Sequence, residues 1–198
     1  ARWKGAPERL VEIEAAALDA ISAPVDDIVV PIGARRFVFT AAEVAGWVAA
    51  AKSGTVPINQ RRERLRVLAQ AELRRRCGGD DRWAEAGPLK AAITKLWPTQ
   101  KAVALVDRFL PGPRGKRRVW TAADQFLVDE ANTLLDGTPF TYGHVVVDEA
   151  QDHSAVALRV IGRRTPAGSC TLVGDVAQST TPAGQERWED VFAHLGMS

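Results

Sequence analysis

The spacing of apolar residues predicts helices over most of the first two thirds of the chain. Apolar positions recur with helical periodicity over residues 6–21 and again over 41–52, where Thr40 can cap the first turn. The same criteria predict further helices from 58 to the glycines at 78–79, on either side of 97–98, and from 121 to 137. Two runs of β-branched or aromatic residues flank Gly33-Ala34, which predicts a β-hairpin near 28–39.

The pattern changes over the last sixty residues. A short run of valines, 145–147, is followed by a predicted helix at about 154–164 and then by a second apolar run, 170–174. This β-α-β order with a short crossover predicts two parallel strands of a buried sheet. We therefore expect an α/β fold in residues 119–198 and a mainly helical region with a small hairpin in residues 1–118.

Composition adds limits but no function. The chain has 198 residues, of which 46% are hydrophobic and 25% are charged, as in soluble proteins of one or two domains. The formal net charge of +2 does not by itself indicate a nucleic-acid-binding protein. Cys77 and Cys170 are far apart, which favours two reduced thiols over a disulfide or a metal site. No apolar run is long enough to cross a membrane, so we expect a cytoplasmic protein without a membrane partner.

The letters VDEA occur twice, in different settings. In the first copy, 128–131, the neighbouring apolar residues recur at helical spacing, so Asp129 and Glu130 should form a solvated pair on the polar face of a helix. In the second copy, 147–150, Asp148 and Glu149 directly follow the three valines. Ligands of parallel sheets bind beyond the carboxyl ends of the strands, so the second copy is the candidate site.

Adjacent carboxylates at a strand end need a partner, and a magnesium ion is the natural one. In phosphoryl transfer from a nucleotide, an aspartate at this position holds the metal, and a neighbouring carboxylate can orient and deprotonate the attacking water. Asp148 and Glu149 fit these two roles. The stretch LVGDVAQ, 172–178, follows the next predicted strand and again places polar groups there: Gly174, Asp175 and Gln178. Gly174 permits a close backbone approach, and Gln178 can donate to a phosphate oxygen.

VVVDEAQD followed by LVGDVAQS resembles motifs II and III of superfamily 1 helicases of the UvrD/Rep type. The resemblance implies a RecA-like ATPase fold, with ATP and Mg²⁺ as cofactors and nucleic acid as a partner. It implies that Asp148 binds magnesium and that Glu149 is the catalytic carboxylate. It further implies that the nucleotide site includes Gln151, Asp152 and Gly174, and that Asp175 and Gln178 link the γ-phosphate to the nucleic-acid channel.

A wider stretch is similar to the HelD branch of that superfamily. TYGHVVVDEAQDHSAVALRVIGRR, GDVAQSTTPAGQERW and the upstream WTAADQFLVDEANTLL carry this likeness. Members of the branch bind bacterial RNA polymerase and use ATP to release it from stalled or post-termination complexes. A long helical insertion, where residues 1–118 stand, also fits the branch. The resemblance therefore implies an ATP-driven protein that acts on RNA polymerase, with a DNA-repair helicase of the UvrD/Rep type as the alternative.

The 198 residues contain no P-loop. The nearest sequence is GPRGKRR, 112–118, which has two residues between its glycines where four are needed, and Arg117 where Ser or Thr should bind magnesium. We interpret it as a basic surface loop. The sequence also begins at Ala1 rather than Met, so we expect a fragment of a larger helicase that does not hydrolyse ATP alone. A non-catalytic interaction module that retains the motor fold stays open as an alternative.

Seven arginines lie in the predicted helix that starts at Ile58. They could neutralise phosphates or dock on an acidic partner surface. The competing interpretation is an ordinary amphipathic helix, with Leu65, Val67, Leu68 and Leu73 inward and its arginines in solvent. The seven arginines are Arg61, Arg62, Arg64, Arg66, Arg74, Arg75 and Arg76.

Overall fold

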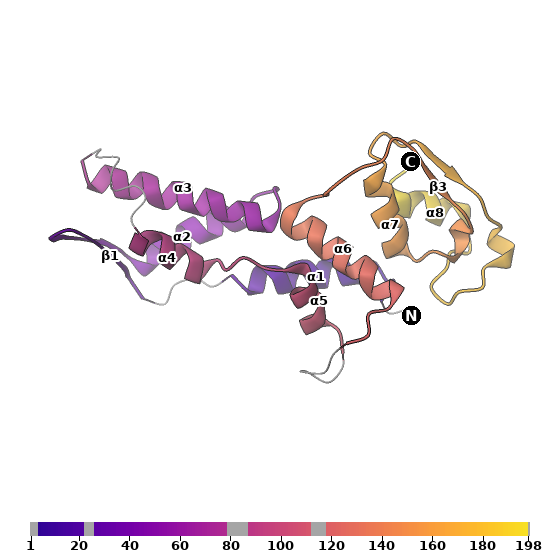
Figure 1. Cartoon of the computed structure of the whole chain (residues 1–198), viewed down its shortest axis with the longest axis horizontal. Helices are drawn as coiled ribbons and strands as arrows, with labels where there is room; N and C mark the ends of the chain where they lie inside the picture. The colour runs from indigo at the N-terminus through magenta and orange to yellow at the C-terminus, as the bar shows by residue number, and fades with distance from the viewer. Residues whose placement is uncertain (1–3, 22–25, 79–86, 112–117, 198) are drawn as a thin grey trace. The chain divides into compact units, whose positions relative to one another are not determined.

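The structure is a computed structural model that describes residues 4–21, 26–78, 87–111 and 118–197. It has a mixed α/β fold whose residues form two compact units (Figure 1). The first, here called the βαβ unit, comprises residues 1–15 and 101–198; the second, the hairpin unit, comprises residues 16–100. Helix α1 (Glu8–Asp19) contributes residues to both. Within the described ranges, no helix is long and apolar enough to span a bilayer.

The described part of the hairpin unit contains the predicted antiparallel hairpin, the end of α1 and three further helices. Strands β1 (Ile28–Ile32) and β2 (Arg35–Phe39) pair in register from Ile28 opposite Phe39 to Ile32 opposite Arg35, which confirms the hairpin. The helices are α2 (Ala41–Lys52), α3 (Ile58–Arg76) and α4 (Gly87–Leu96). Trp97 is fully buried in this unit.

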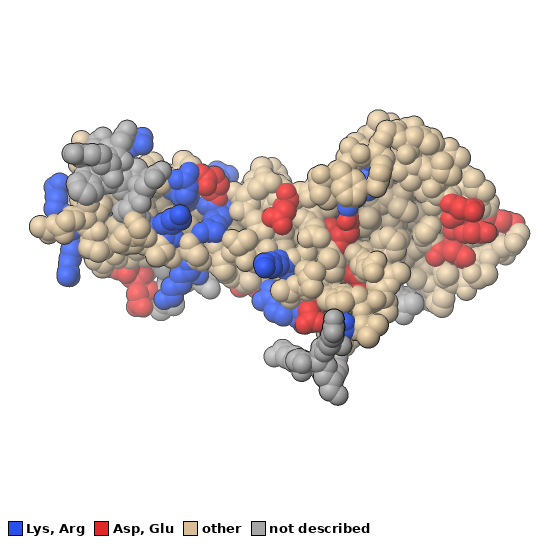
Figure 2. Space-filling model, viewed as in Figure 1, with Lys and Arg blue, Asp and Glu red and all other residues tan. Residues whose placement is uncertain are grey.

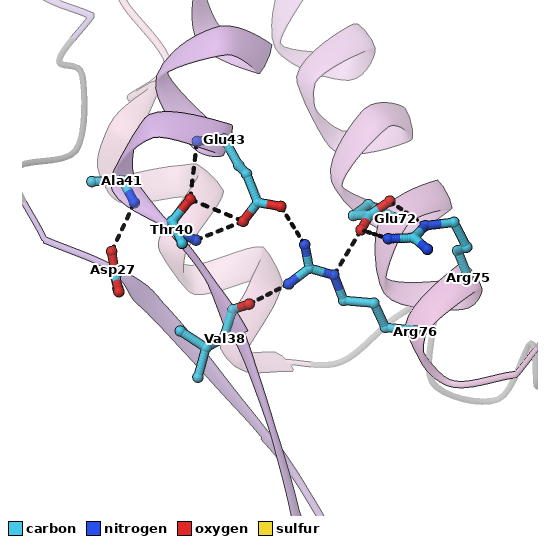
Figure 3. A network of polar contacts seen from close by, with 8 residues as sticks. All are labelled: Asp27, Val38, Thr40, Ala41, Glu43, Glu72, Arg75 and Arg76. Atoms are coloured by element: carbon cyan, nitrogen blue, oxygen red, sulfur yellow. Dashed lines mark hydrogen bonds and ion pairs between the residues drawn. The ribbon is translucent and has the colours of Figure 1, made fainter.

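The start of α2 is fixed by polar contacts within its own first turn and by contacts from α3 (Figure 3). Thr40 and Glu43 form the predicted cap as a reciprocal capping box, in which each side chain accepts a bond from the other's backbone N–H. The guanidinium of Arg76 bonds to Glu43, to the backbone carbonyl of Val38 and to Glu72, with 2.7 Å from Nε to Glu72 Oε1. These contacts tie the C-terminal end of α3 to the hairpin.

The buried face of α3 differs from the prediction at one position. The buried residues recur at positions 58, 61, 65, 69 and 73, a spacing of three to four that marks a single helical stripe. Leu65 and Leu73 lie on it, and Leu68 is half-buried. Val67 was predicted to point inward, but it is 52% exposed because it lies two residues, about half a turn, from the stripe. Arg61 occupies a buried position instead.

The βαβ unit contains the helices α5 (Ala102–Phe109), α6 (Ala122–Asp136) and α8 (Trp188–Leu195) besides the predicted β-α-β element. Strands β3 (Val145–Val147) and β4 (Cys170–Leu172) are parallel, with Val145 opposite Cys170 and Val147 opposite Leu172. Helix α7 (Ala155–Arg164) connects them, which confirms the parallel pair and its crossover. The prediction of a buried sheet was wrong, because Val146 in the middle of β3 is 65% exposed. Two short 3-10 helices follow the strands, η2 (Ala150–Asp152) and η3 (Val176–Gln178).

One hydrophobic cluster of the βαβ unit lies where β3, α7 and α8 meet (Figure 1). Its buried members are Val147, Ala150, Leu158, Val191 and Leu195. Helices α7 and α8 approach so closely that a Cβ on Gly162 would lie 2.0 Å from the carbonyl oxygen of Leu195. The crossing therefore requires glycine at this position of α7.

The first VDEA copy is not the solvated pair that the sequence predicts. Glu130 on α6 is only 7% exposed and bonds to Arg163 of α7, while Asp129 bonds to Arg163 and Arg164. Burial raises the pKa of the Glu130 carboxyl, and the Arg163 guanidinium opposes that rise. The prediction was wrong because helical periodicity identifies the polar face of α6 but not the basic end of α7 that packs against it.

Candidate functional site

The loops that follow β3 and β4 lie at the same edge of the parallel pair, as the sequence predicts. The backbone ladder continues beyond the strands: the N–H of Val173 donates to the carbonyl of Val147 at 2.9 Å, and the N–H of Ala150 donates to Val173 at 3.0 Å. The two segments DEAQD, 148–152, and GDVAQ, 174–178, are thus held side by side. All seven residues predicted for the nucleotide site belong to these two segments.

Asp148 and Glu149 are exposed at the end of β3. The backbone N–H of Glu149 donates to Asp148 Oδ1 at 2.9 Å. Glu149 has φ 48° and ψ 47°, which makes it the one non-glycine residue with positive φ among the described residues. A left-handed conformation costs an L-residue about 1–2 kcal/mol, so contacts around Glu149 must hold it in place.

Gln151 provides one of these contacts. It is only 1% exposed, so it lies inside the protein rather than on the surface that a nucleotide would touch. Its Nε2 donates to Glu149 Oε2 at 2.8 Å, and its Oε1 accepts from the backbone N–H of Asp175 at 3.1 Å. The side chain of Gln151 therefore joins the catalytic candidate of one loop to the backbone of the other.

Gly174 makes room for this side chain. A Cβ at Gly174 would lie 2.1 Å from Gln151 Oε1 and 3.0 Å from the backbone nitrogen of Ala150. The first separation is far inside van der Waals contact, so a larger residue would displace the amide. The close approach predicted for Gly174 is thus present, and it is made with Gln151.

Asp152 bonds to Thr180 and Thr181, which lie further along the loop after β4. Its carboxylate accepts from the Thr180 backbone N–H at 2.8 Å and from the Thr180 hydroxyl at 2.9 Å, and its carbonyl accepts from the Thr181 hydroxyl at 2.9 Å. The bonds from Thr180 hold the pKa of the Asp152 carboxyl below its usual value. Thr180 and Thr181 were missed at the sequence level, where the only signal was hydroxyl residues directly after the GDVAQ segment.

Asp175 and Gln178 form a compact turn at η3. Asp175 Oδ1 accepts from the backbone N–H of Ala177 at 2.9 Å, and Oδ2 accepts from Gln178 Nε2 at 2.9 Å. Both residues are exposed. The carboxylate of Asp175 thus caps η3 and holds the Gln178 amide at the same edge of the sheet as Asp148 and Glu149.

The carboxylates at the end of β3 suit magnesium only in part. Carboxylate oxygens are ligands that Mg²⁺ prefers, and the ion usually keeps waters and takes substrate phosphates as further ligands. Within the parts of the chain that the structure describes, no group of three or more His, Cys, Asp or Glu side chains could hold a metal. Asp148 and Glu149 thus fit an ion that is completed by phosphate and water, not a cage made by the protein.

The seven arginines of α3 belong to the hairpin unit, over which basic side chains are numerous on the face shown in Figure 2. Arg61 is 7% exposed and donates to the carbonyls of Val56 and Lys52, at 2.6 and 2.9 Å, so little of it is accessible to a partner. Arg62 donates to two threonine hydroxyls of the segment 94–99. Three more bond to glutamates of the same unit: Arg66, Arg75 and Arg76.

Arg64 and Arg74 are exposed on α3. The basic GPRGKRR segment falls outside the described residues except for Arg118, whose Nε donates to Asp107 at 2.6 Å. Five of the seven arginines of α3 thus bond to groups of the hairpin unit itself. Contact between these arginines and a partner remains a prediction from the sequence.

Comparison of the chain with protein-family models gave no match, and comparison with curated proteins gave none either. Any functional conclusion therefore rests on the geometry at the ends of β3 and β4 and on the sequence of the two loops there.

Proposed function

We propose that residues 119–198 form the part of the ATPase site that binds magnesium and activates water in an ATP-driven motor of superfamily 1. The observation that supports this most is the joining of the two loops by Gln151, which connects Glu149 to the Asp175 backbone. Loops at the carboxyl ends of neighbouring parallel strands are where nucleotide sites of α/β proteins form. The two loops resemble helicase motifs II and III, and we take ATP hydrolysis as the reaction from this resemblance.

In this proposal Asp148 binds magnesium, directly or through water, and Glu149 is the general base. A bound magnesium would supply charge neutralisation for the phosphates of the nucleotide. Glu149 accepts the proton of the attacking water, for which its exposed carboxylate is available at the strand end. Gln178 donates to a γ-phosphate oxygen, and Asp175 holds that amide in place. The RecA-like fold and the cytoplasmic location belong to the same proposal.

The substrate assignment rests on the resemblance to the HelD branch. We propose that the motor acts on complexes of RNA polymerase with nucleic acid, and that a UvrD/Rep-type DNA-repair helicase is the runner-up. Because the 198 residues contain no P-loop, the phosphate-binding loop has to come from the rest of a longer helicase chain. The same observation favours the second candidate function, a non-catalytic interaction module that retained this part of the motor.

One experiment separates these functions. In the longer protein, Glu149→Gln should reduce single-turnover ATP hydrolysis by about 10²–10⁴-fold, because the general base is lost while shape is kept. Binding of Mg-ATP, measured by calorimetry, should change little. Glu14→Gln, an exposed carboxylate on α1, is the matched control and should hydrolyse like the wild type. A wild-type protein that binds no ATP would support the non-catalytic module, and normal hydrolysis by Glu149→Gln would remove Glu149 from catalysis.

A further inference from the structure

We propose that Gln151 is a positioning residue: it holds the carboxylate of Glu149, and it couples the position of that carboxylate to the position of the loop after β4. The inference rests on the proposed ATPase function, in which Glu149 is the general base. Gln151 has no role of its own in the chemistry, because its side chain is 1% exposed. Its two amide bonds, to Glu149 Oε2 and from the Asp175 N–H, make it a link between the loops.

The partners of the amide allow only one orientation. The NH₂ group faces the Glu149 carboxylate, which can only accept, and the carbonyl oxygen faces the Asp175 N–H, which can only donate. Rotating the amide by half a turn would place oxygen against carboxylate and N–H against N–H. Because leaving a buried donor or acceptor unsatisfied costs about 1–3 kcal/mol, the rotated state is disfavoured. A movement of Glu149 or of the Asp175 backbone therefore has to move the Gln151 amide or break one of its two bonds.

The loop after β4 also encloses Gln151 from its backbone side. The N–H of Gln185 donates to the Gln151 carbonyl at 2.6 Å, and a Cβ at Gly184 would lie 2.5 Å from that oxygen. On the other side, Gly174 packs against the amide. A shift of this loop therefore cannot occur without moving Gln151 or breaking these contacts.

Glu149 needs such a guide, because its carboxylate is exposed and a free glutamate side chain samples many rotamers. A misplacement of about 1 Å can cost two orders of magnitude in rate. Asp175 also holds Gln178, the proposed γ-phosphate contact. The state of the γ-phosphate at Gln178 thus reaches the general base through Asp175 and Gln151.

The first test uses the 198-residue chain without nucleotide. Gln151→Met keeps length and removes both amide bonds, and Gln125→Met is the control on an exposed position of α6. By NMR, hydrogen exchange at the Asp175 amide should accelerate about tenfold in Gln151→Met, the value of one hydrogen bond, and stay unchanged in Gln125→Met. Equal exchange in the two variants would show that the link does not exist.

The second test measures steady-state ATP hydrolysis in the longer protein. Gln151→Met should lower kcat by about 100-fold and leave the KM for ATP within about threefold, because orientation is lost and binding is not. In a Glu149→Gln background the same substitution should have almost no further effect on kcat. A kcat that stays at the wild-type level, or a full additional loss in the Glu149→Gln background, would overturn the proposal.

Gly174→Ala provides an independent route, since its Cβ would displace the amide. It should lower kcat in the wild type, and a kcat that stays at the wild-type level would contradict the link. Thermal unfolding of each variant identifies any that fail to fold. If the wild type itself does not hydrolyse ATP, the proposed function fails, whereas the exchange experiment still decides whether Gln151 links the two loops.

Discussion

Thr180 donates both its backbone N–H and its hydroxyl to the carboxylate of Asp152, at 2.8 and 2.9 Å. The two residues are 28 positions apart and belong to the loops that follow different strands. With the Gln151 link, this pair makes the loops after β3 and β4 one unit at the sheet edge. The sequence predicts Asp152 as part of a nucleotide site, and in the structure its carboxylate joins the two loops.

We expect Asp152→Asn to lower the urea midpoint of unfolding. The asparagine oxygen can still accept from the Thr180 N–H, and its NH₂ can donate to the Thr180 hydroxyl, but both bonds lose the negative charge of the carboxylate and become weaker. Asp19→Asn, an exposed residue of α1, removes the same charge and should leave the midpoint unchanged. The role of Asp152 as a clamp would be contradicted if both variants unfolded like the wild type.

The carboxyl of Glu72 should make the stability of the hairpin unit depend on acid pH. Hydrogen bonds from Arg75 and Arg76 lower the pKa of Glu72 to about 2, whereas an unfolded chain has about 4.3 (Figure 3). A depressed folded-state pKa stabilises above the unfolded pKa, and this contribution is lost as pH falls from about 4.3 towards 2. Thermal unfolding between pH 6 and pH 2.5 should therefore show a steeper loss for the wild type than for Glu72→Gln.

Gln178→Ala in the longer protein should impair stimulation of the ATPase by nucleic acid or polymerase more than it impairs affinity for ATP. Asp175 holds the amide, and in the proposed function that amide contacts the γ-phosphate and little else of the nucleotide. Basal and stimulated rates should be measured with the Kd for Mg-ATP. Equal reduction of both rates would mean that Gln178 has no coupling role.

The 198-residue chain alone should bind Mg-ATP weakly and not hydrolyse it. Tight triphosphate binding in this type of site depends on the N–H groups and lysine of a P-loop, which the sequence lacks. Asp148 and Glu149 would repel the nucleotide unless magnesium bridged them. Calorimetric titration is the measurement, and a micromolar Kd would point to a phosphate site elsewhere, with residues 112–118 the first to test.

Two helical glycines should respond oppositely to alanine. Gly162→Ala places a Cβ 2.0 Å from the Leu195 carbonyl oxygen, so we expect a loss of about 1–3 kcal/mol in the free energy of unfolding. At Gly46 in α2 a Cβ would meet nothing within 4 Å, so Gly46→Ala should stabilise by about 0.5–1 kcal/mol. Urea unfolding measures both, and a neutral Gly162→Ala would mean that α7 and α8 can separate at no cost.

The sequence by itself determined the order and type of the main elements. Local signals were sufficient for the Thr40 cap, for the hairpin around Gly33 and for the strand–helix–strand order around α7, because each depends on residues a few positions apart. They also separated the two VDEA copies correctly into a helix and a strand end. The choice of the second copy as the functional site remains a prediction.

Tertiary structure decided what the polar residues contact. Glu130 is buried against Arg163, Asp152 clamps Thr180, and Gln151 turns inward to join Glu149 to Asp175. Val67, predicted to lie inside, is exposed while Arg61 is buried. For Glu130, Asp152 and Gln151 the physical reason is shared: each bonds to a residue from a distant segment, and sequence periodicity carries no information about that partner.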